Sequence, residues 1–195
     1  MDKDSNIILN KNNIIIKKKD KNEYQIFYSV ENHNIYLPKI INFTLMDIFY
    51  TLNKDIFEKY KIIIHNETNA TIYILIKHFF CDLGISQKYI CINVIIEKNN
   101  DLIIFKADTC LDTSSNTSSN KLIEEFNDKN NENKELLIIQ NAIIQCKIIN
   151  NHKIDLCSSM LLKDKKETPL FIENFASQIF NKIILRVKQF IENYA

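Results

Sequence analysis

The chain has 195 residues, of which 46% are hydrophobic and 25% are charged, and its formal net charge is +1 at pH 7. This length suits one domain, residues 1–195, with a sizeable buried core. Because the charges nearly cancel and the lysines are scattered, no nucleic-acid partner is indicated. No uncharged run of about 18 apolar residues occurs, so no membrane span is predicted. We attribute the abundance of Ile, Asn and Lys to compositional bias and discount Asn runs.

The five cysteines contain no C-x-x-C pair, and most of them lie in apolar, strand-like runs. We therefore expect reduced, buried thiols in a reducing compartment. His78 and Cys81 are three residues apart, which is half of a metal site. No second pair with ligand spacing accompanies them, so no metal site is predicted.

The first third of the chain mixes strand and helix signals. Residues 12–19 predict a strand, with residues 7–9 pairing beside it. Residues 20–32 have helical spacing, although their QIFYSV stretch also suits a strand. Residues 33–40 are a loop or irregular turn that contains proline, and residues 52–60 are predicted to be helical.

From residue 61 the pattern becomes β. Hairpins are predicted at residues 61–80, 88–108 and 136–162. In the second hairpin Asn99 and Asn100 are the turn residues, and one strand has an apolar face at period two, formed by Ile90, Ile92, Val94 and Ile96. Residues 112–134 lack a core pattern and are predicted to be a disordered or mobile insertion.

The clearest signal is a long helix over residues 168–195. Thr168 is expected to cap it and Pro169 to occupy its first position. Apolar residues recur every three or four positions along the whole segment. At about 1.5 Å per residue the helix would reach about 40 Å, far enough to cross a sheet.

Antiparallel hairpins in succession favour one meandering sheet, and the last helix is the element long enough to cover its concave face. The predicted fold is therefore α+β, a helix-grip arrangement in which a curved antiparallel sheet wraps around a long C-terminal helix. Such an arrangement tends to leave a space lined by Ile and Phe, which is an apolar ligand site. The alternative, a filled core without a cavity, stays open.

No catalytic constellation is recognisable. The chain has one glycine, Gly84, so a glycine-rich phosphate loop is excluded. It has no G-x-S-x-G motif, and its four histidines lie in predicted loops or strand ends. We therefore predict no catalytic residue.

Several segments resemble, in order, the START-type family of coenzyme-Q-binding proteins that assist mitochondrial respiration, within the polyketide-cyclase/START superfamily. Residues 30–38, VENHNIYLP, are similar to the family's Val-Glu-Asn-Tyr-x-x-Phe-Leu-Pro. Residues 82–98 resemble the strand after the family's turn, and residues 139–143 its Leu-x-Asn-x-Trp. Residues 168–190 resemble its Ser-Pro-Leu opening and the spaced phenylalanines of its last helix.

The resemblance covers most of the chain apart from two insertions, near residues 41–60 and 112–134. It also departs from the family pattern. The family usually has Trp and Cys after Leu-Pro, where this chain has Lys39 and Ile40, and Ile143 replaces the Trp after the Asn. We interpret these changes as drift, although loss of a headgroup contact is an alternative.

The resemblance implies a START-like fold that binds ubiquinone between the sheet and the terminal helix. It also implies a non-catalytic carrier or chaperone for the respiratory chain and quinone biosynthesis, peripheral to the matrix side of the inner mitochondrial membrane. The residues expected to contact the isoprenoid tail are Phe175, Ile179, Ile183 and Val187, with plain core packing as the alternative. The residues expected to form a mobile lip are Tyr36, Leu37 and Pro38, with a structural turn as the alternative.

The exposed lip and the nearby Lys39 predict a peripheral membrane contact. The N-terminus carries acids and no arginine, so it is not a usual signal or transit peptide. Two alternatives stay open. A cyclase/aromatase-like enzyme would draw on Asp155 and His78, and a ribosome-associated regulator is disfavoured by the near-neutral charge.

Overall fold

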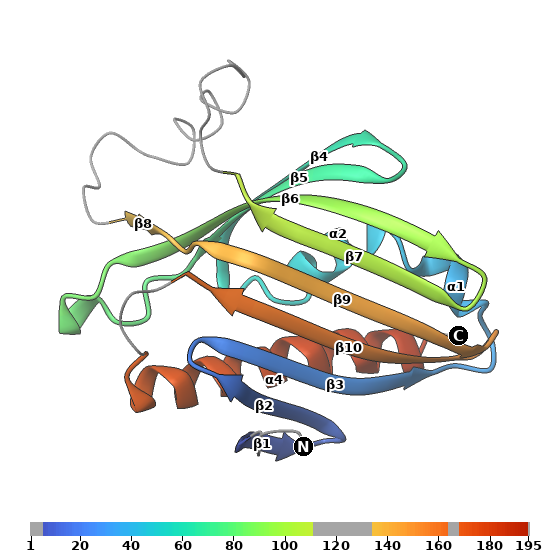
Figure 1. Cartoon of the computed structure of the whole chain (residues 1–195), viewed down its shortest axis with the longest axis horizontal. Helices are drawn as coiled ribbons and strands as arrows, with labels where there is room; N and C mark the ends of the chain where they lie inside the picture. Colours follow the sequence, from blue (N-terminus) through green and yellow to red (C-terminus); the bar gives the residue numbers. More distant parts are fainter. Residues whose placement is uncertain (1–5, 111–133, 164–167, 195) are drawn as a thin grey trace.

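A curved ten-stranded sheet dominates the computed structural model, which describes residues 6–110, 134–163 and 168–194 (Figure 1). Its strands are β1 (Asn6–Lys11), β2 (Ile14–Asp20), β3 (Glu23–Glu31), β4 (Phe57–Asn66), β5 (Asn69–Ile76), β6 (Gln87–Asn99), β7 (Leu102–Thr109), β8 (Lys134–Leu136), β9 (Ile139–Asn150) and β10 (Lys153–Leu162). The helical elements are α1 (Leu37–Ile40), α2 (Thr44–Thr51), the 3-10 turn η1 (Cys81–Leu83) and α4 (Leu170–Glu192).

The strands follow the order β1-β2-β3-β10-β9-β7-β6-β5-β4, and β8 pairs with β6 in parallel. All other neighbours are antiparallel, and the predicted hairpins correspond to β4–β5, β6–β7 and β9–β10. The β3–β10 pairing joins the two ends of the chain. Helix α4 then lies along the inner side of the sheet (Figure 1), so the predicted helix-grip fold is confirmed.

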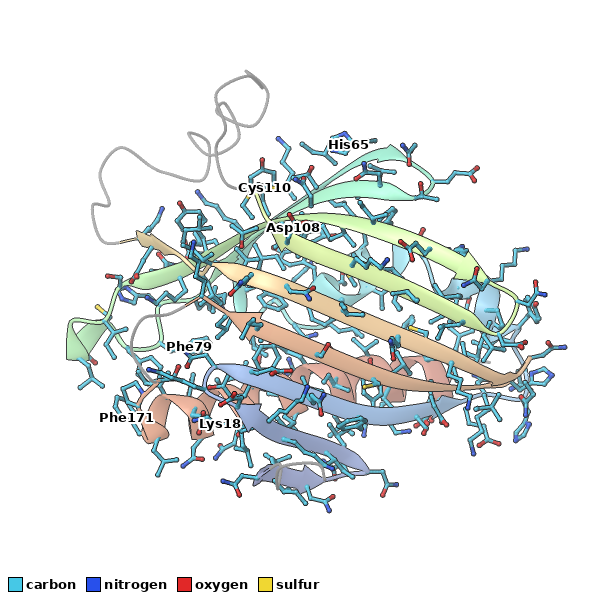
Figure 2. All side chains as sticks on the ribbon, in the orientation of Figure 1. Lys18, His65, Phe79, Asp108, Cys110 and Phe171 are labelled. Atoms are coloured by element: carbon cyan, nitrogen blue, oxygen red, sulfur yellow. The ribbon has the colours of Figure 1, made fainter. Side chains whose placement is uncertain are left out.

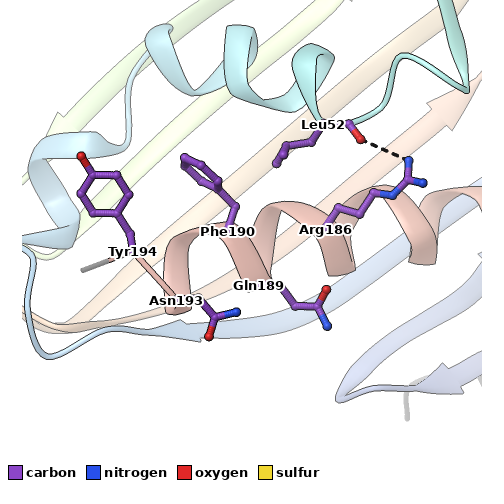
Figure 3. Close-up of a pocket in the computed structure, with 6 residues that line it drawn as sticks. All are labelled: Leu52, Arg186, Gln189, Phe190, Asn193 and Tyr194. Carbon is purple, nitrogen blue, oxygen red and sulfur yellow. Dashed lines mark hydrogen bonds between the residues drawn. The ribbon is translucent and has the colours of Figure 1, made fainter.

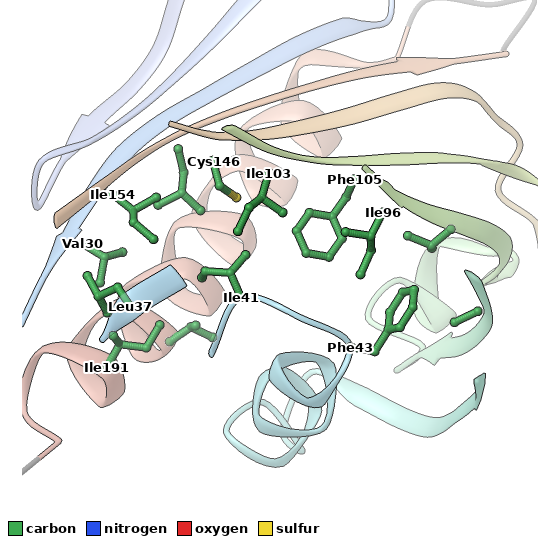
Figure 4. Packing of buried hydrophobic residues seen from close by; sticks show 14 of the residues in the cluster. Val30, Leu37, Ile41, Phe43, Ile96, Ile103, Phe105, Cys146, Ile154 and Ile191 are labelled. Atoms are coloured by element: carbon green, nitrogen blue, oxygen red, sulfur yellow. The ribbon is translucent and has the colours of Figure 1, made fainter. Parts of the chain in front are cut away.

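The main core lies between the sheet, α1, α2 and the C-terminal half of α4 (Figure 4). Because strand side chains alternate, each central strand contributes its inward face to this core. The buried members on the central strands are Val94, Ile96, Ile103, Phe105, Cys146, Ile154 and Leu156. Each fully buried side chain of this size stabilises the fold by about 1.5–3 kcal/mol.

For residues 20–32 the strand alternative is confirmed over the helical one, and the helix predicted at residues 52–60 is wrong. Residues 20–32 contain strand β3, because Glu23–Glu31 pairs with β2 on one side and β10 on the other. This pairing overrides the local helical spacing. The helix predicted at residues 52–60 lies earlier, as α2, and the Asn53 side chain donates to Phe49 O at 2.8 Å just beyond its end. Phe57 already begins β4.

Asparagines shape the N-terminal turns, so these asparagines reflect more than compositional bias. Asn12 and Asn13 have φ angles of 57° and 59° and separate β1 from β2, so the predicted first strand begins two residues later than expected. Asn22, with φ 59°, ends the β2–β3 turn. Asn adopts this left-handed conformation more readily than most residues. The predicted mobile insertion, residues 112–134, lies outside the described residues apart from Lys134, which begins β8.

Helix α4 begins without the predicted threonine cap. Pro169 is the N-cap residue, with ψ 139°, and no side chain caps the helix. The Thr168 hydroxyl instead lies 3.5 Å from Asn22 Oδ1. Thr168 therefore contacts the β2–β3 turn rather than the first turn of the helix.

At its other end, α4 is held by the connection between β3 and α1. The Asn32 side-chain amide donates to the carbonyl oxygens of Ile191 at 2.6 Å and Tyr194 at 2.8 Å. Asn32 Oδ1 accepts from Asn34 N at 2.7 Å, and only 4% of Asn32 is exposed. A buried side chain thus satisfies carbonyls that a helix C-terminus leaves without partners.

Arg186 joins α4 to the segment between α2 and β4. Its guanidinium donates to Asp55 Oδ2 at 3.1 Å, Asn53 Oδ1 at 3.1 Å and Leu52 O at 3.2 Å. Lys182 also contacts Asp55, at 2.7 Å. The hydrogen bonds from Arg186 and Lys182 hold the pKa of the Asp55 carboxyl well below its usual range.

Replacing Asp55 tests this tie. Asp55→Asn should lower the free energy of unfolding at pH 7 by about 1 kcal/mol, because the pair is bidentate but largely exposed. Since folding lowers the Asp55 pKa, its contribution is present above the unfolded-state value, near 3.8, and is lost as pH falls below it. Urea unfolding at pH 7 and pH 3 should show the difference between the two proteins shrinking with acid. A difference that grew with acid would contradict this.

Replacing Asn32 tests the cap at the other end of the helix. Asn32→Ala should destabilise the fold by about 1–3 kcal/mol, since two helix carbonyls lose a buried donor. Hydrogen exchange should show faster opening of the last turn of α4. Asn34→Ala, an exposed change in the same loop, is the matched control and should leave both quantities unchanged. Equal stability of the two variants would show that the Asn32 bonds contribute nothing.

Candidate functional site

The space between α4 and the inner face of the sheet has a closed end near the C-terminus of the helix. A cavity of about 20 Å³ remains there, bounded by β3, β10, α1, α2 and α4. It is lined by Tyr28, Val30, Leu37, Ile41, Leu45, Ile154, Leu156, Val187 and Ile191. This is room for about one water molecule, so at this end the core is filled.

The other end of the same space, which we call the open end, is less completely buried. The inward-facing side chains of the central strands are only half-buried there, although each strand has neighbours on both sides. They include Ile92, Ala107, Ala142, Ile144, Ser158 and Met160. Ala176, Ile179 and Phe180 of α4 are also half-buried. Because no strand edge exposes these residues, their partial exposure lies on the face of the sheet that is turned toward the N-terminal half of α4.

An aromatic cluster stands at this open end. Phe175 of α4 packs edge-on against Phe79 and Phe80, with ring centroids 5.3 and 4.7 Å apart, and Phe171 lies 6.1 Å from Phe80. Phe79 and Phe80 follow β5, so two chain segments meet here (Figure 2). These segments also carry the exposed apolar residues that we call the mouth patch: Phe79, Leu83, Leu170 and Phe171, exposed by 40%, 63%, 69% and 52%.

The mouth patch was missed in the sequence. Its signals were the Phe79-Phe80 pair beyond the last strand position of β5, and a phenylalanine, Phe171, on the solvent side of the helix. Phe79 lies beyond the apolar alternation of β5, and that position marks it as a surface residue.

Three polar side chains hold the first turn of α4 beside the mouth patch. The Tyr24 hydroxyl donates to Glu173 Oε1 at 2.7 Å, and Lys18 Nζ lies 3.0 Å from the same oxygen. Glu173 is 7% exposed. Burial and then the Glu173 bond raise the pKa of Tyr24 to about 12. This group holds one flank of the helix to β2 and β3, while the other flank rests on the aromatic cluster.

The four predicted helix residues are spread along the inner side of α4. Val187 lines the closed cavity, and Ile183 and Ile179 pack near Ile56 and Phe57. Phe175 belongs to the aromatic cluster at the open end. They therefore run from one end of the interior to the other, and their contact with a lipid stays a prediction.

The three predicted lip residues lie at the closed end. Leu37 is 1% exposed and begins α1, where its backbone N–H donates to Asn151 O at 2.9 Å. Pro38 is half-buried, and Tyr36 is 54% exposed. This geometry matches the alternative of a structural turn, and a gating role for these residues stays a prediction.

A separate surface pocket of about 590 Å³ lies between α2 and the C-terminal half of α4 (Figure 3). It is lined by Leu52, Arg186, Gln189, Phe190, Asn193 and Tyr194. Arg186 is engaged by Asp55 and by Leu52 O, as described above. None of the seven predicted site residues lines this pocket.

The two residues considered for catalysis lie in different parts of the structure. Asp155 is exposed on the outer face of β10 and accepts from the Ser29 hydroxyl at 2.6 Å. His78 Nε2 lies 2.6 Å from Ile85 O. Within residues 6–110, 134–163 and 168–194, no three His, Cys, Asp or Glu side chains group to hold a metal ion. None of the helices in those ranges has the length and apolar character needed to cross a membrane.

Comparisons with known proteins identify the fold. No family model matches the sequence, and no curated protein matches it. Among solved structures, the human StarD13 lipid transfer and protein localization domain superposes with a TM-score of 0.68 at 7% identity, covering 98% of this chain and 91% of that domain. Human StAR-related lipid transfer protein 5 superposes with 0.64 at 9% identity, covering 96% and 86%.

A bacterial structure gives the same result. The STAR-related lipid transfer protein from Xanthomonas axonopodis superposes with a TM-score of 0.64 at 10% identity, covering 96% of this chain and 98% of that protein. At such identities the likeness concerns architecture, and it matches along nearly the full length of each chain. The chain therefore has the START-like helix-grip fold of these lipid transfer domains.

Proposed function

We propose that this protein is a non-catalytic lipid carrier that binds an isoprenoid quinone, ubiquinone, between the sheet and α4. The observation that carries the proposal is the open end of the interior, where apolar side chains on central strands are accessible to solvent. Apolar surface that is neither buried nor at an edge is costly unless a ligand covers it. The likeness to lipid transfer domains supports the same conclusion.

The energetics suit a long apolar tail. Each methylene buried contributes about 0.8 kcal/mol, so a few isoprene units against Ile92, Ile144 and Met160 supply micromolar affinity. The closed cavity, at about 20 Å³, admits a tail only if side chains such as Leu45 and Val187 move aside. We therefore place the ligand at the open end first, with the tail pointing toward the closed end.

The choice of ubiquinone rests on the sequence resemblance, which also supports the proposed location at the matrix side of the inner mitochondrial membrane. A quinone ring needs a few hydrogen-bond donors in an otherwise apolar site. The Ser158 hydroxyl, on the inward face of β10, is the donor we assign to one of its carbonyl oxygens.

Delivery of a lipid requires contact with a bilayer, and we propose that the mouth patch makes it. Two phenylalanines and two leucines are exposed there beside the open end, and exposed Lys77 and Lys163 lie at the same end of the sheet. Apolar insertion and attraction of lysines to anionic lipid act together. The predicted lip offers one exposed apolar side chain, Tyr36, at the opposite end of α4.

Ligand recovery tests the carrier. Protein purified from a quinone-producing host should yield close to one ubiquinone per chain on organic extraction and mass spectrometry. Ile179→Asp, which places a carboxylate at the open end, should lower the recovery at least tenfold, whereas Gln178→Asp on the exposed face should not. Recovery of another lipid would remove the ubiquinone assignment and keep the carrier. A polyketide-like acid would favour the enzyme, and the absence of any lipid would contradict a carrier.

Vesicle binding tests the membrane contact. Co-sedimentation with vesicles containing anionic phospholipid should fall at least tenfold for the double variant Leu83→Asp, Phe171→Asp, since two inserted side chains are lost and two negative charges are added. Both positions are exposed, so thermal unfolding should change little. Tyr36→Asp is the matched control at the opposite end of the helix. If Tyr36→Asp abolished binding and the double variant did not, the lip would be the contact.

A further inference from the structure

Cys91 and Cys110 face each other across two antiparallel strands. The β6–β7 register pairs Ile92 with Thr109, which brings Cys91 opposite Cys110, and Cys110 N donates to Cys91 O at 3.0 Å. Directly opposed residues have Cα atoms about 4.5–5.5 Å apart and side chains on the same face. A disulfide spans Cα distances of about 4.4–6.8 Å. The backbone therefore already has the spacing that a disulfide needs.

The two thiols share an apolar cluster on the outer face of the sheet. Cys91 is 1% exposed and packs with Tyr73, while half-buried Cys110 and Leu136 pack against them. The Cys91 thiol is within hydrogen-bonding reach of Cys110, and this contact together with burial raises the pKa of Cys110. The two residues thus differ in access: a small reagent reaches Cys110 first.

We propose that Cys91 and Cys110 form a reversible disulfide when the protein meets an oxidant of the small-molecule disulfide class, such as oxidised glutathione. The Cys110 thiolate attacks one glutathione sulfur, forms a mixed disulfide and expels one glutathione thiolate. The Cys91 thiol then loses its proton and attacks the Cys110 sulfur, which expels the second glutathione. Two protein thiols are oxidised, one glutathione disulfide is reduced to two thiols, and the two protons go to the departing thiolates.

The disulfide would link Cys110, the residue after β7, to Cys91 of β6, beside the open end of the interior. Thr109, the residue before Cys110, already bonds Ile139 through its hydroxyl, at 2.7 Å to N and 3.0 Å to O. Ile92, the residue after Cys91, is one of the half-buried inward residues. The disulfide would therefore stiffen the sheet wall behind the open end without entering the apolar interior.

The test is oxidation of the purified protein with excess oxidised glutathione, followed by acid quenching, alkylation under denaturing conditions and peptide mass spectrometry without reduction. We expect a Cys91–Cys110 linked peptide as the main intramolecular product, formed about tenfold faster for each pH unit between 7 and 9 because the thiolate is scarce. The oxidised protein should unfold about 5–10 °C higher than the reduced protein, and dithiothreitol should reverse the shift.

Two further cysteines of the chain provide controls. Cys146 and Cys157 lie on neighbouring strands but on opposite faces, so no linked peptide should join them. Cys157→Ser should retain the Cys91–Cys110 product and the thermal shift, and Cys110→Ser and Cys110→Ala should both lose them. The proposal is overturned if Cys91 stays fully alkylatable while Cys110 carries glutathione. A linked peptide without any thermal shift would support the disulfide and contradict the stiffening of the sheet wall.

Discussion

The arrangement of the helix on the sheet depends on the buried side-chain amide of Asn32. It binds the last carbonyls of α4 from the loop that leaves β3, and the same loop is held by the turn before β10 through Asn32 N to His152 O and Leu37 N to Asn151 O. The helix terminus, the sheet and α1 therefore meet in one hydrogen-bonded junction. Beside it the core is filled, because side chains of β3, β10, α1 and α4 pack in one buried cluster that leaves about 20 Å³.

Because of this junction, the two ends of α4 are held by different kinds of contact. At the junction the helix is held by main-chain and amide bonds that leave little freedom. At the other end Glu173 holds one flank, and the opposite flank rests on phenylalanine rings whose packing is not directional. Hydrogen bonds are directional and apolar contacts are not, so the two ends of the helix are held by different kinds of contact. The accessible inward residues of the central strands occur at the end with the rings.

Much of the fold was readable from the chain. Hairpins with period-two apolar faces, and a helix with an apolar residue every three or four positions, are local patterns that depend on neighbouring residues alone. The errors have local causes too. Segment 20–32 satisfies both periods, and its pairing with β10, some 130 residues away, decided for the strand. Asn12 and Asn13 are turn signals that the high asparagine content of the chain obscures.

The sequence by itself determined the hairpins, the antiparallel meander and the inner side of α4, because periodicity is a property of consecutive residues. Only the tertiary structure decided where the interior is open and where it is closed. That choice depends on which distant groups meet: Asn32 with the end of the helix, and Phe79 and Phe80 with its first turns. Leu37 and Pro38 illustrate the difference, since an apolar bend in the sequence suits either a lip or a core turn. The neighbours that bury Leu37 come from β10 and α4, which no local pattern specifies.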